Sequence, residues 1–419
     1  MTNRYIAHIT IEADTPLKVG SNSSDFLQDS PIQRDWNGLP MILGTSIAGV
    51  LRKDFDENLT DDVFGKDNGS KVIISNALLL DEEKNVNESL LLEKSKFLQI
   101  FDNLPIREHT AITEKGVTKE HSKFDEEVVY KGVCFKFSIE ILDDKDSFEI
   151  ILKLLSSPSF RLGGGTTKGF GKLKILEIKT ESFNVDNYKE YSSSLNHSLK
   201  IEYEIKPLTS STHATYILKI TPDDFFMFGS GFGDKDADQT PVYEKVIDYD
   251  KKNDDDSIGG LSDKQILIPA SSVKGALSHR TAFHYNKAML ELKKDHTQVN
   301  EKNDAVKAIF GHKKEKKLGR KGKILIADCF KTDSNEVKTF DHVSIDRFTG
   351  GAIDGALFQE KTIAQKNEWE IEMLLENNID EVSIDAFEKA LDDVCSGMLA
   401  LGGATTKGHG VFVGKWSKS

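Results

Sequence analysis

Two glycine-rich loops carry the most specific chemical signal in this chain. The loop Leu162–Gly171 has the sequence LGGGTTKGFG, the loop Leu401–Gly410 has LGGATTKGHG, and eight of ten positions match at an offset of 239. Because glycine lacks Cβ, the backbone N–H groups of such a loop can approach a phosphate closely. A lysine at the same place in both copies adds positive charge. The predicted anion-contacting residues are Gly164, Gly165, Lys168, Gly403 and Lys407.

A tight turn that needs glycine only for its shape is the alternative interpretation of these loops. Both copies also keep Thr-Thr-Lys, which turn geometry alone does not require, and this favours contact with a ligand. A Walker A phosphate loop is excluded, because neither copy ends in Gly-Lys-Ser/Thr.

Two serine-led helices are the second candidate for anion binding. Helices are predicted after Ser46 and Ser272, with both serines as N-caps, and the N–H groups of a helix N-terminus suit an anion. A glycine follows each serine by three residues and costs about 1 kcal/mol relative to alanine, which suggests close approach of another backbone such as a nucleic acid. The alternative is an ordinary capped helix whose glycine packs on a sheet. The predicted contacts are Ser46, Gly49, Arg52, Ser272, Lys274, Gly275 and Arg280.

Internal repetition extends beyond the loops. SIAGVL at 46–51 is matched by SVKGAL at 272–277, VFG at 63–65 by IFG at 309–311, and His109-x-x-Ile by His342-x-x-Ile. The chain is therefore a tandem duplication of a unit of about 200 residues. Serine clusters near 192–212 favour a junction there, which predicts one domain over residues 1–200 and another over 201–419.

Hydrophobic periodicity predicts the elements that position these motifs. Alternating apolar residues predict strands from Tyr5, at Ile73-Ile74 and over 135–139, whereas helical spacing predicts helices over 146–155, 281–292 and 385–399. The strand–helix–strand–strand–helix–strand order suggests an α+β fold, with two ferredoxin-like or RNA-recognition-like units carrying insertions.

Composition sets the broad class of protein. The net charge is −13, hydrophobic residues are 38% of the chain, and no run approaches the ~20 apolar residues of a membrane helix. The N-terminus lacks the apolar core of a secretory signal, and three distant cysteines support neither disulfides nor a zinc site, so we expect a cytoplasmic protein. The basic run 312–323 is a candidate phosphate contact, and the acidic run 234–256 is expected to be mobile.

The combination of motifs resembles the RAMP superfamily of CRISPR systems, and more narrowly the backbone subunits of type III effector complexes. The matching stretches are LQDSPIQRD at 27–35, residues 39–52, VSIDRFTGGA at 343–352 and the two glycine loops. Because both halves match, the chain resembles tandem fusions of two such subunits, as in type III-D-like complexes. The resemblance implies a modified RNA-recognition fold whose β-hairpin thumbs wedge between guide and target RNA.

The resemblance also implies which residues act. The thumbs fall at 341–362, with an apolar wedge, and at 107–129, where Thr113 replaces Asp346 and Gly116 is the only glycine. The family's cleaving aspartate corresponds to Asp29 and, with one extra residue before the proline, to Asp238, while Asp236 competes with Asp238. Further RNA contacts are expected from Arg34, Arg347 and Phe348, and the histidines 109, 121, 342 and 409 are either RNA contacts or packing residues.

The expected function is that of an RNA-guided endoribonuclease within an assembled complex. Its partners would be CRISPR RNA, single-stranded target RNA and other type III subunits, without a membrane. RNA can supply its own 2′-hydroxyl nucleophile, so one carboxylate can act as general base or hold a divalent metal ion, for which Mg²⁺ is the expected cofactor. The alternatives are a guide-binding scaffold that leaves cutting to its neighbours and a nuclease that processes guide RNA.

Overall fold

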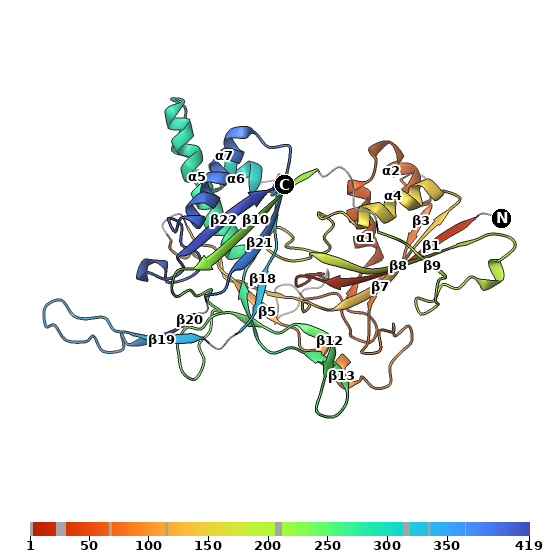
Figure 1. Ribbon diagram of the computed structural model, residues 1–419, viewed down its shortest axis with the longest axis horizontal. Coiled ribbons are helices and arrows are strands. Elements are labelled where there is room, and N and C mark those ends of the chain that lie inside the picture. The colour runs from red at the N-terminus through yellow and green to blue at the C-terminus, as the bar shows by residue number, and fades with distance from the viewer. Residues whose placement is uncertain are drawn as a thin grey trace.

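The computed structural model describes residues 3–21, 31–66, 69–113, 116–205, 212–312, 319–333, 336–364 and 366–419. Two α+β lobes lie side by side, one formed mainly by each half of the chain, and a hairpin projects from the second lobe (Figure 1). In each lobe the helices cover one face of an antiparallel sheet.

The first lobe is built around β1, in which burial alternates from Ile9 to Ala13, as the period-two pattern predicts, while residues 6–9 are all buried. The sheet order is β2-β4-β7-β1-β8-β9, with β3 also paired to β7. The elements of the first half are β1 (Arg4–Ala13), β2 (Met41–Ile42), α1 (Gly44–Asp54), α2 (Glu57–Phe64), β3 (Val72–Ile74), β4 (Ala77–Leu79), α3 (Lys96–Gln99), β5 (Ile106–His109), β6 (Phe124–Glu127), β7 (Cys134–Leu142), α4 (Lys145–Leu155), β8 (Leu173–Phe183) and β9 (Ile201–Glu202).

The second lobe repeats this plan around β10, which lies between β21 and β22 as β1 lies between β7 and β8. Its main sheet has the order β17-β21-β10-β22, and β11-β14-β18 form a smaller sheet. The elements of the second half are β10 (His213–Pro222), β11 (Tyr243–Glu244), β12 (Ile247–Lys252), β13 (Ile258–Leu261), β14 (Gln265–Ile268), α5 (Ala270–Glu291), α6 (Asp304–Ile309), β15 (Gly311–His312), β16 (Arg320–Lys321), β17 (Ile324–Ile326), β18 (Cys329–Thr332), β19 (Val337–His342), β20 (Phe358–Ile363), β21 (Trp369–Glu376), α7 (Glu381–Cys395) and β22 (Phe412–Lys418).

Most predicted elements are confirmed. The three predicted strands are β1, β3 and β7, and the three predicted helices lie in α4, α5 and α7, although α7 ends at Cys395 and not at residue 399. The domain boundary at residue 200 stays a prediction. The core of the first lobe also includes Ile247 and Tyr249 from the second half of the chain.

The prediction that Ser46 and Ser272 are N-caps is wrong. Each serine is the third residue of its helix, because the extended residue before the helix is Leu43 in α1 and Pro269 in α5. The first N–H of each helix instead donates to a side chain from a neighbouring strand region: to Asn76 in α1, at 2.9 Å, and to Asp328 in α5, at 2.8 Å. This long-range cap satisfies a donor that helix geometry leaves unpaired.

The expectation that the acidic run 234–256 is mobile is also wrong for its second part. The hairpin β12–β13, which lies below the first lobe in Figure 1, docks on that lobe through the buried Tyr249. The Tyr249 hydroxyl donates to the Leu80 carbonyl at 3.0 Å and accepts from the Cys134 N–H at 3.2 Å. The Tyr249 ring also packs on Phe97. Burial alternates along β12, so Asp248 and Asp250 are exposed, and Asp250 and Asp255 pair with Lys84 and Lys96 of the first half.

The Tyr249 hydroxyl can be tested directly. We expect Tyr249→Phe to destabilise the first lobe by about 2 kcal/mol, because it leaves the buried Cys134 N–H without an acceptor. Urea unfolding followed by fluorescence should show an earlier transition, and Tyr188→Phe, at a half-exposed tyrosine, is the control. Equal midpoints for the two variants would contradict this account of hairpin docking.

Candidate nucleic-acid interface

Each glycine loop packs on the segment that follows the first strand of its own lobe. The Gly164 N–H donates to the Lys18 carbonyl and the Gly403 N–H to the Met227 carbonyl, both at 2.7 Å. The preceding glycines have positive φ, and a Cβ on Gly163 would lie 2.5 Å from the Lys18 carbonyl oxygen. Glycine is therefore required for close packing, and these two N–H groups are already used within the protein. The loops thereby hold the segments that lead to the two predicted cleavage loops.

The lysine side of the loops differs between the halves. In the first loop Thr166 and Gly169 are buried, because this part of the loop packs on the start of α5 in the second lobe. In the second loop residues 405–408 are all exposed. Nearly the same loop sequence is therefore covered by the second half in the first copy and exposed to solvent in the second copy.

A group of lysines gathers where the first loop meets α5. The Lys274 ammonium donates to Thr167 Oγ1 at 3.1 Å. Burial, with Lys168 and Lys321 nearby, lowers the pKa of Lys274 to about 8. Because like charges held together repel one another, a bound polyanion would be stabilised here. The structure thus brings together predicted contacts from opposite halves of the chain, and Lys321 adds one described residue of the basic run.

The two helix glycines face open space. Gly49 and Gly275 are exposed, and a Cβ at either position would meet nothing within 4 Å. The alternative that these glycines pack on a sheet is therefore wrong. Together with Ser46 and the exposed Ser272 they leave a bare surface on α1 and on α5, which a ligand backbone could approach closely.

Two predicted contacts on these helices already have protein partners. Arg52 donates to the Gly65 carbonyl at 3.1 Å and to Asp61 at 2.8 Å. Arg280 is paired with Asp393 of α7. Their contacts with RNA stay predictions.

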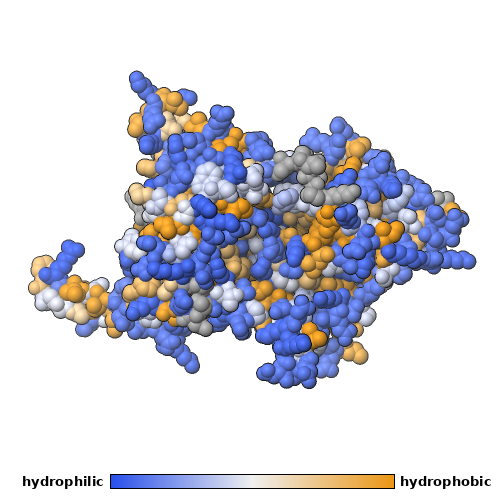
Figure 2. Space-filling model, in the orientation of Figure 1, coloured by the Kyte–Doolittle hydropathy of each residue, from blue (hydrophilic) through white to orange (hydrophobic). Residues whose placement is uncertain are grey.

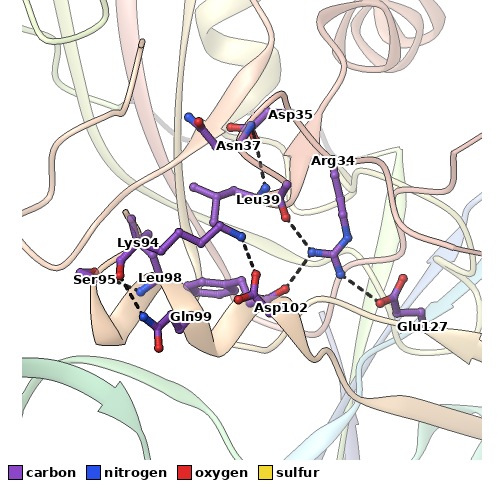
Figure 3. A network of polar contacts seen from close by, with 12 residues as sticks. Arg34, Asp35, Asn37, Leu39, Lys94, Ser95, Leu98, Gln99, Asp102 and Glu127 are labelled. Atoms are coloured by element: carbon purple, nitrogen blue, oxygen red, sulfur yellow. Dashed lines mark hydrogen bonds and ion pairs between the residues drawn. The ribbon is translucent and has the colours of Figure 1, made fainter. Parts of the chain in front are cut away.

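Arg34 is held in a network of polar contacts beside the first lobe (Figure 3). Its guanidinium donates to the carbonyls of Gly38 and Phe101, both at 2.8 Å, and pairs with Glu127 at 3.1 Å. Arg34 thus ties the segment after position 29 to strand β6. Its contact with RNA also stays a prediction.

Both predicted thumbs are β-hairpins. Strands β19 and β20 form the second thumb, whose tip projects far from the lobe and carries apolar side chains (Figure 2). Phe348 at this tip is 99% exposed, and Arg347 beside it is exposed as well. Strands β5 and β6 form the first thumb despite its departures in sequence, and its described tip closes through Thr113 and Gly116.

A buried carboxylate lies at the base of the first thumb. Glu126 pairs with Lys18 and lies 3.1 Å from His109 Nε2 and 3.8 Å from the Lys168 ammonium. His109 stacks on Phe124, its cross-strand partner. Although burial would raise the pKa of Glu126, the neighbouring His109 and Lys18 lower it to about 2.

The base of the second thumb repeats this arrangement. Glu360 is fully buried, and one of its oxygens lies 2.7 Å from the Lys407 ammonium and 3.7 Å from His342 Nε2. His409 lies 3.4 Å from the other oxygen, and His342 stacks on Phe358. In each half, therefore, the glycine-loop lysine and the thumb histidine share one buried glutamate.

The two glutamates were not identified from the sequence. The signal that could have revealed them is the repeated Phe-x-Glu of Phe124-Asp125-Glu126 and Phe358-Gln359-Glu360, which follows the repeated histidine at a similar distance. Three of the four histidines noted in the sequence are packing residues of these clusters, and the fourth, His121, lies at the first thumb tip with positive φ.

The loop that carries Asp238 lies between the two thumbs. Asp238 is exposed, and its carboxylate accepts from the Gln359 N–H of the second thumb at 2.8 Å. On the other side, Glu108 of the first thumb lies against Gly231. The competing Asp236 pairs with Lys361 at 3.2 Å. Asp29 lies outside the described residues.

Backbone register relates the two candidate aspartates. Gln33 N–H donates to the Val19 carbonyl and Val242 N–H to the Phe228 carbonyl, both at 2.7 Å, which aligns position 33 with 242. The two segments between these bonds have the same number of residues, so counting along the sequence with this offset pairs Asp29 with Asp238. The equivalent bridges Gly20–Ile32 and Gly229–Pro241 place Pro241 where the first half has Ile32, so the position of the proline differs between the halves and the length of the segment does not.

The fit of a metal ion is limited to a partial site. Within the described ranges no group of three or more His, Cys, Asp or Glu side chains is arranged to hold a metal. Mg²⁺ often binds through one or two carboxylates together with substrate phosphates and water, so an exposed aspartate such as Asp238 is compatible with that mode.

Comparison with known proteins identifies the family. The RAMP superfamily matches residues 10–174 and 250–413, one match in each half. The chain belongs to the RAMP superfamily. It is also 25% identical over 233 residues to the CRISPR system Cms endoribonuclease Csm3 of Methanocaldococcus jannaschii, and the match covers 50% of this chain and 91% of that protein.

Membership confirms the predicted fold class of two tandem RAMP units, and the thumbs and loops can be compared between them. No helix in the described part of this RAMP protein is long and apolar enough to cross a bilayer.

The thumb-base glutamate gives a pH-dependent prediction. Because the pKa of Glu126 lies near 2, below the ordinary 4.5, its charge stabilises the fold by roughly 3 kcal/mol at neutral pH. This contribution declines as the pH falls below about 4.5 and is lost near pH 2. We expect Glu126→Gln to lower the midpoint of urea unfolding at pH 7, with a difference from wild type that shrinks towards pH 3.

Glu120→Gln is the matched control, since Glu120 is an exposed glutamate in the same hairpin. A difference between Glu126→Gln and wild type that stays constant from pH 7 to pH 3 would contradict the proposed role of the ionised carboxylate.

Proposed function

We propose that this RAMP protein is a fused backbone subunit of a type III CRISPR effector complex, which binds CRISPR RNA and cleaves complementary target RNA. The observation that carries the proposal is the placement of the Asp238 loop between two thumbs, one from each half. The similarity to an endoribonuclease of a CRISPR system supports the same function. In this proposal base pairing with the guide selects the target, so the protein needs few base-reading side chains.

Guide binding is assigned to the seam between the halves. The seam combines the lysines around Lys274 with the bare surface at Gly275 and the threonines of the first glycine loop. These groups suit a sugar–phosphate backbone, whose recognition depends on charge and close approach and not on base identity. The overall charge of −13 does not oppose this, because the lysines are gathered at one place.

Cleavage is assigned to the aspartate loops. When a thumb splays the target strand, the 2′-hydroxyl oxygen of one nucleotide can attack the adjacent phosphorus in line, and the 5′-oxygen leaves. An exposed carboxylate such as Asp238 can accept the proton of the 2′-hydroxyl. Asp238 could hold Mg²⁺, which would supply charge neutralisation at the phosphate. The hydrogen bond from the Gln359 N–H orients the carboxylate relative to the thumb.

A non-catalytic scaffold is the second candidate, because the same seam and thumbs would serve a subunit that only binds guide RNA. A guide-processing nuclease is less well supported, since His109 and His342, at the bases of the two thumbs, are packed against phenylalanine rings. Incubation with unprocessed repeat RNA distinguishes this third possibility.

The aspartates provide the test of cleavage. In the assembled complex, we expect Asp29→Ala and Asp238→Ala each to abolish one cut in a complementary target, with a loss of roughly 10²- to 10⁴-fold for the missing general base. The guide should remain bound, and the double variant should lose both cuts. Gel analysis of labelled target gives the product pattern.

Asp236→Ala is the control for Asp238→Ala, because Asp236 lies two residues away and pairs with Lys361. An unchanged product pattern in the double variant would favour the scaffold. If Asp236→Ala lost a cut and Asp238→Ala did not, Asp236 and not Asp238 would be the cleaving residue.

The metal requirement has its own test. We expect EDTA to abolish target cleavage and excess Mg²⁺ to restore it, while guide RNA stays bound in a filter-binding assay. Cleavage that continues at an unchanged rate in EDTA would contradict a metal role and leave the carboxylate as a general base alone.

A further inference from the structure

Three polar contacts, which we call locks, join the halves where the first thumb and the first glycine loop meet the second half. Arg107 of the first thumb is fully buried between Glu244 and Asp328 of the second half. Lys172, just after the first glycine loop, pairs with Glu372 at 3.1 Å. The third lock is the hydrogen bond from Lys274 to Thr167. Because the chain is a tandem repeat, each locking residue has a counterpart on one of the two open faces.

The thumb-side open face, formed by the second thumb and second glycine loop, lacks both cations. In the first thumb, Arg107 lies opposite Glu126 in the strand register. In the second thumb, Phe340 lies opposite the equivalent Glu360, so Phe340 is the counterpart of Arg107. The loop repeat with its offset of 239 places Val411 where Lys172 stands.

The helix-side open face, formed around α1, lacks most of the acceptors. Asn76 caps α1 as Asp328 caps α5, but it carries no charge. The Ser138 carbonyl accepts from Ser75 as the Glu372 carbonyl accepts from Ala327, which places a serine where Glu372 stands. The remaining counterpart carboxylate, Asp35, equivalent to Glu244 in the register, accepts from two N–H groups of its own turn.

The third lock is also missing between the open faces. Lys274 is the fifth residue of α5, and the fifth residue of α1 is Ala48. The counterpart of Thr167 is Thr406 on the thumb-side face. In a self-stacked copy, Thr406 would face the methyl group of Ala48 and not an ammonium group. A copy of this chain stacked in the internal geometry would thus place Phe340 against Asn76 and the turn-bound Asp35, and Val411 against a serine, with no cation opposite the remaining carboxylate.

The thumb-side face is more apolar than its internal counterpart. Val413, 45% exposed, stands where the first half has Lys174, and it is bridged to Ser396, close to Met398, which is 69% exposed. The thumb-side face thus lacks the three positive charges that Arg107, Lys172 and Lys174 supply in the first half. An acidic edge would therefore gain little electrostatic attraction on this face.

We propose that this chain does not stack on copies of itself, and that its thumb-side face binds a different RAMP-type subunit with an uncharged, apolar docking edge. The proposal rests on the proposed membership in a multisubunit complex. It assigns the two open faces to different neighbours, because neither can repeat the locks of the junction inside the chain.

Transplanting the internal locks onto the open faces tests the proposal. One variant carries Phe340→Arg and Val411→Lys, and the other carries Asn76→Asp and Ser138→Glu. We expect wild type and each variant alone to be monomers by light scattering at micromolar concentration without RNA, and the two variants mixed to form a one-to-one dimer. The thumb-side variant with glutamate at both positions is the matched control and should stay monomeric with the second variant.

Phe340 packs on Phe225 and His409, so its replacement could disturb the fold. Val411→Lys mixed with Ser138→Glu is therefore a second pair, confined to half-buried positions, and should show weaker association of the same kind. Failure of both mixtures to associate would overturn the assignment. So would wild-type dimers that disappear in the glutamate variant. Because no RNA is present, either result is independent of whether the chain cleaves RNA.

Discussion

The buried Arg107 guanidinium is the interaction on which the arrangement of the two halves depends. Burial alone would lower the pKa of Arg107, but Asp328 and Glu244 raise it, so the side chain is charged at any physiological pH. Asp328 simultaneously caps α5. One carboxylate thus joins the first thumb to the helix that opens the second half. Removing a partner from such a buried pair leaves an uncompensated charge, which typically costs about 3–5 kcal/mol.

That junction also determines where the candidate functional groups meet. Packing of the first glycine loop on α5 brings Thr167 to Lys274, and packing of the first thumb on the second half brings Glu108 to the loop of Asp238. Neither pairing exists within one half. The functional surface is therefore a property of two adjacent units, which explains why the equivalent loop at 405–408 remains exposed.

Much of the fold follows from local sequence pattern, and less of the site does. Periodicity predicted β1, β7, α4 and the extended α5, and repetition predicted the tandem units. The thumb-base glutamates were missed because a single buried acid has no local signature. The docking of Tyr249 was missed because the acidic composition of its hairpin is typical of a solvent-exposed segment. The partners of Tyr249, such as Leu80, are distant in sequence. The N-caps were assigned to Ser46 and Ser272 because the true partners, Asn76 and Asp328, are distant in sequence.

The joining of both units in one polypeptide has a consequence for the Arg107 junction. Two separate proteins must find each other from solution, so the strength of their contact limits how dilute they can be. Covalent connection replaces that search with a fixed local concentration, which is independent of expression level. Two separate proteins would have to desolvate this ion pair each time they associate. Two units of one chain do so once, when the chain folds. Fusion thus allowed this one seam to become permanent, while the surfaces at either side remained free to diverge.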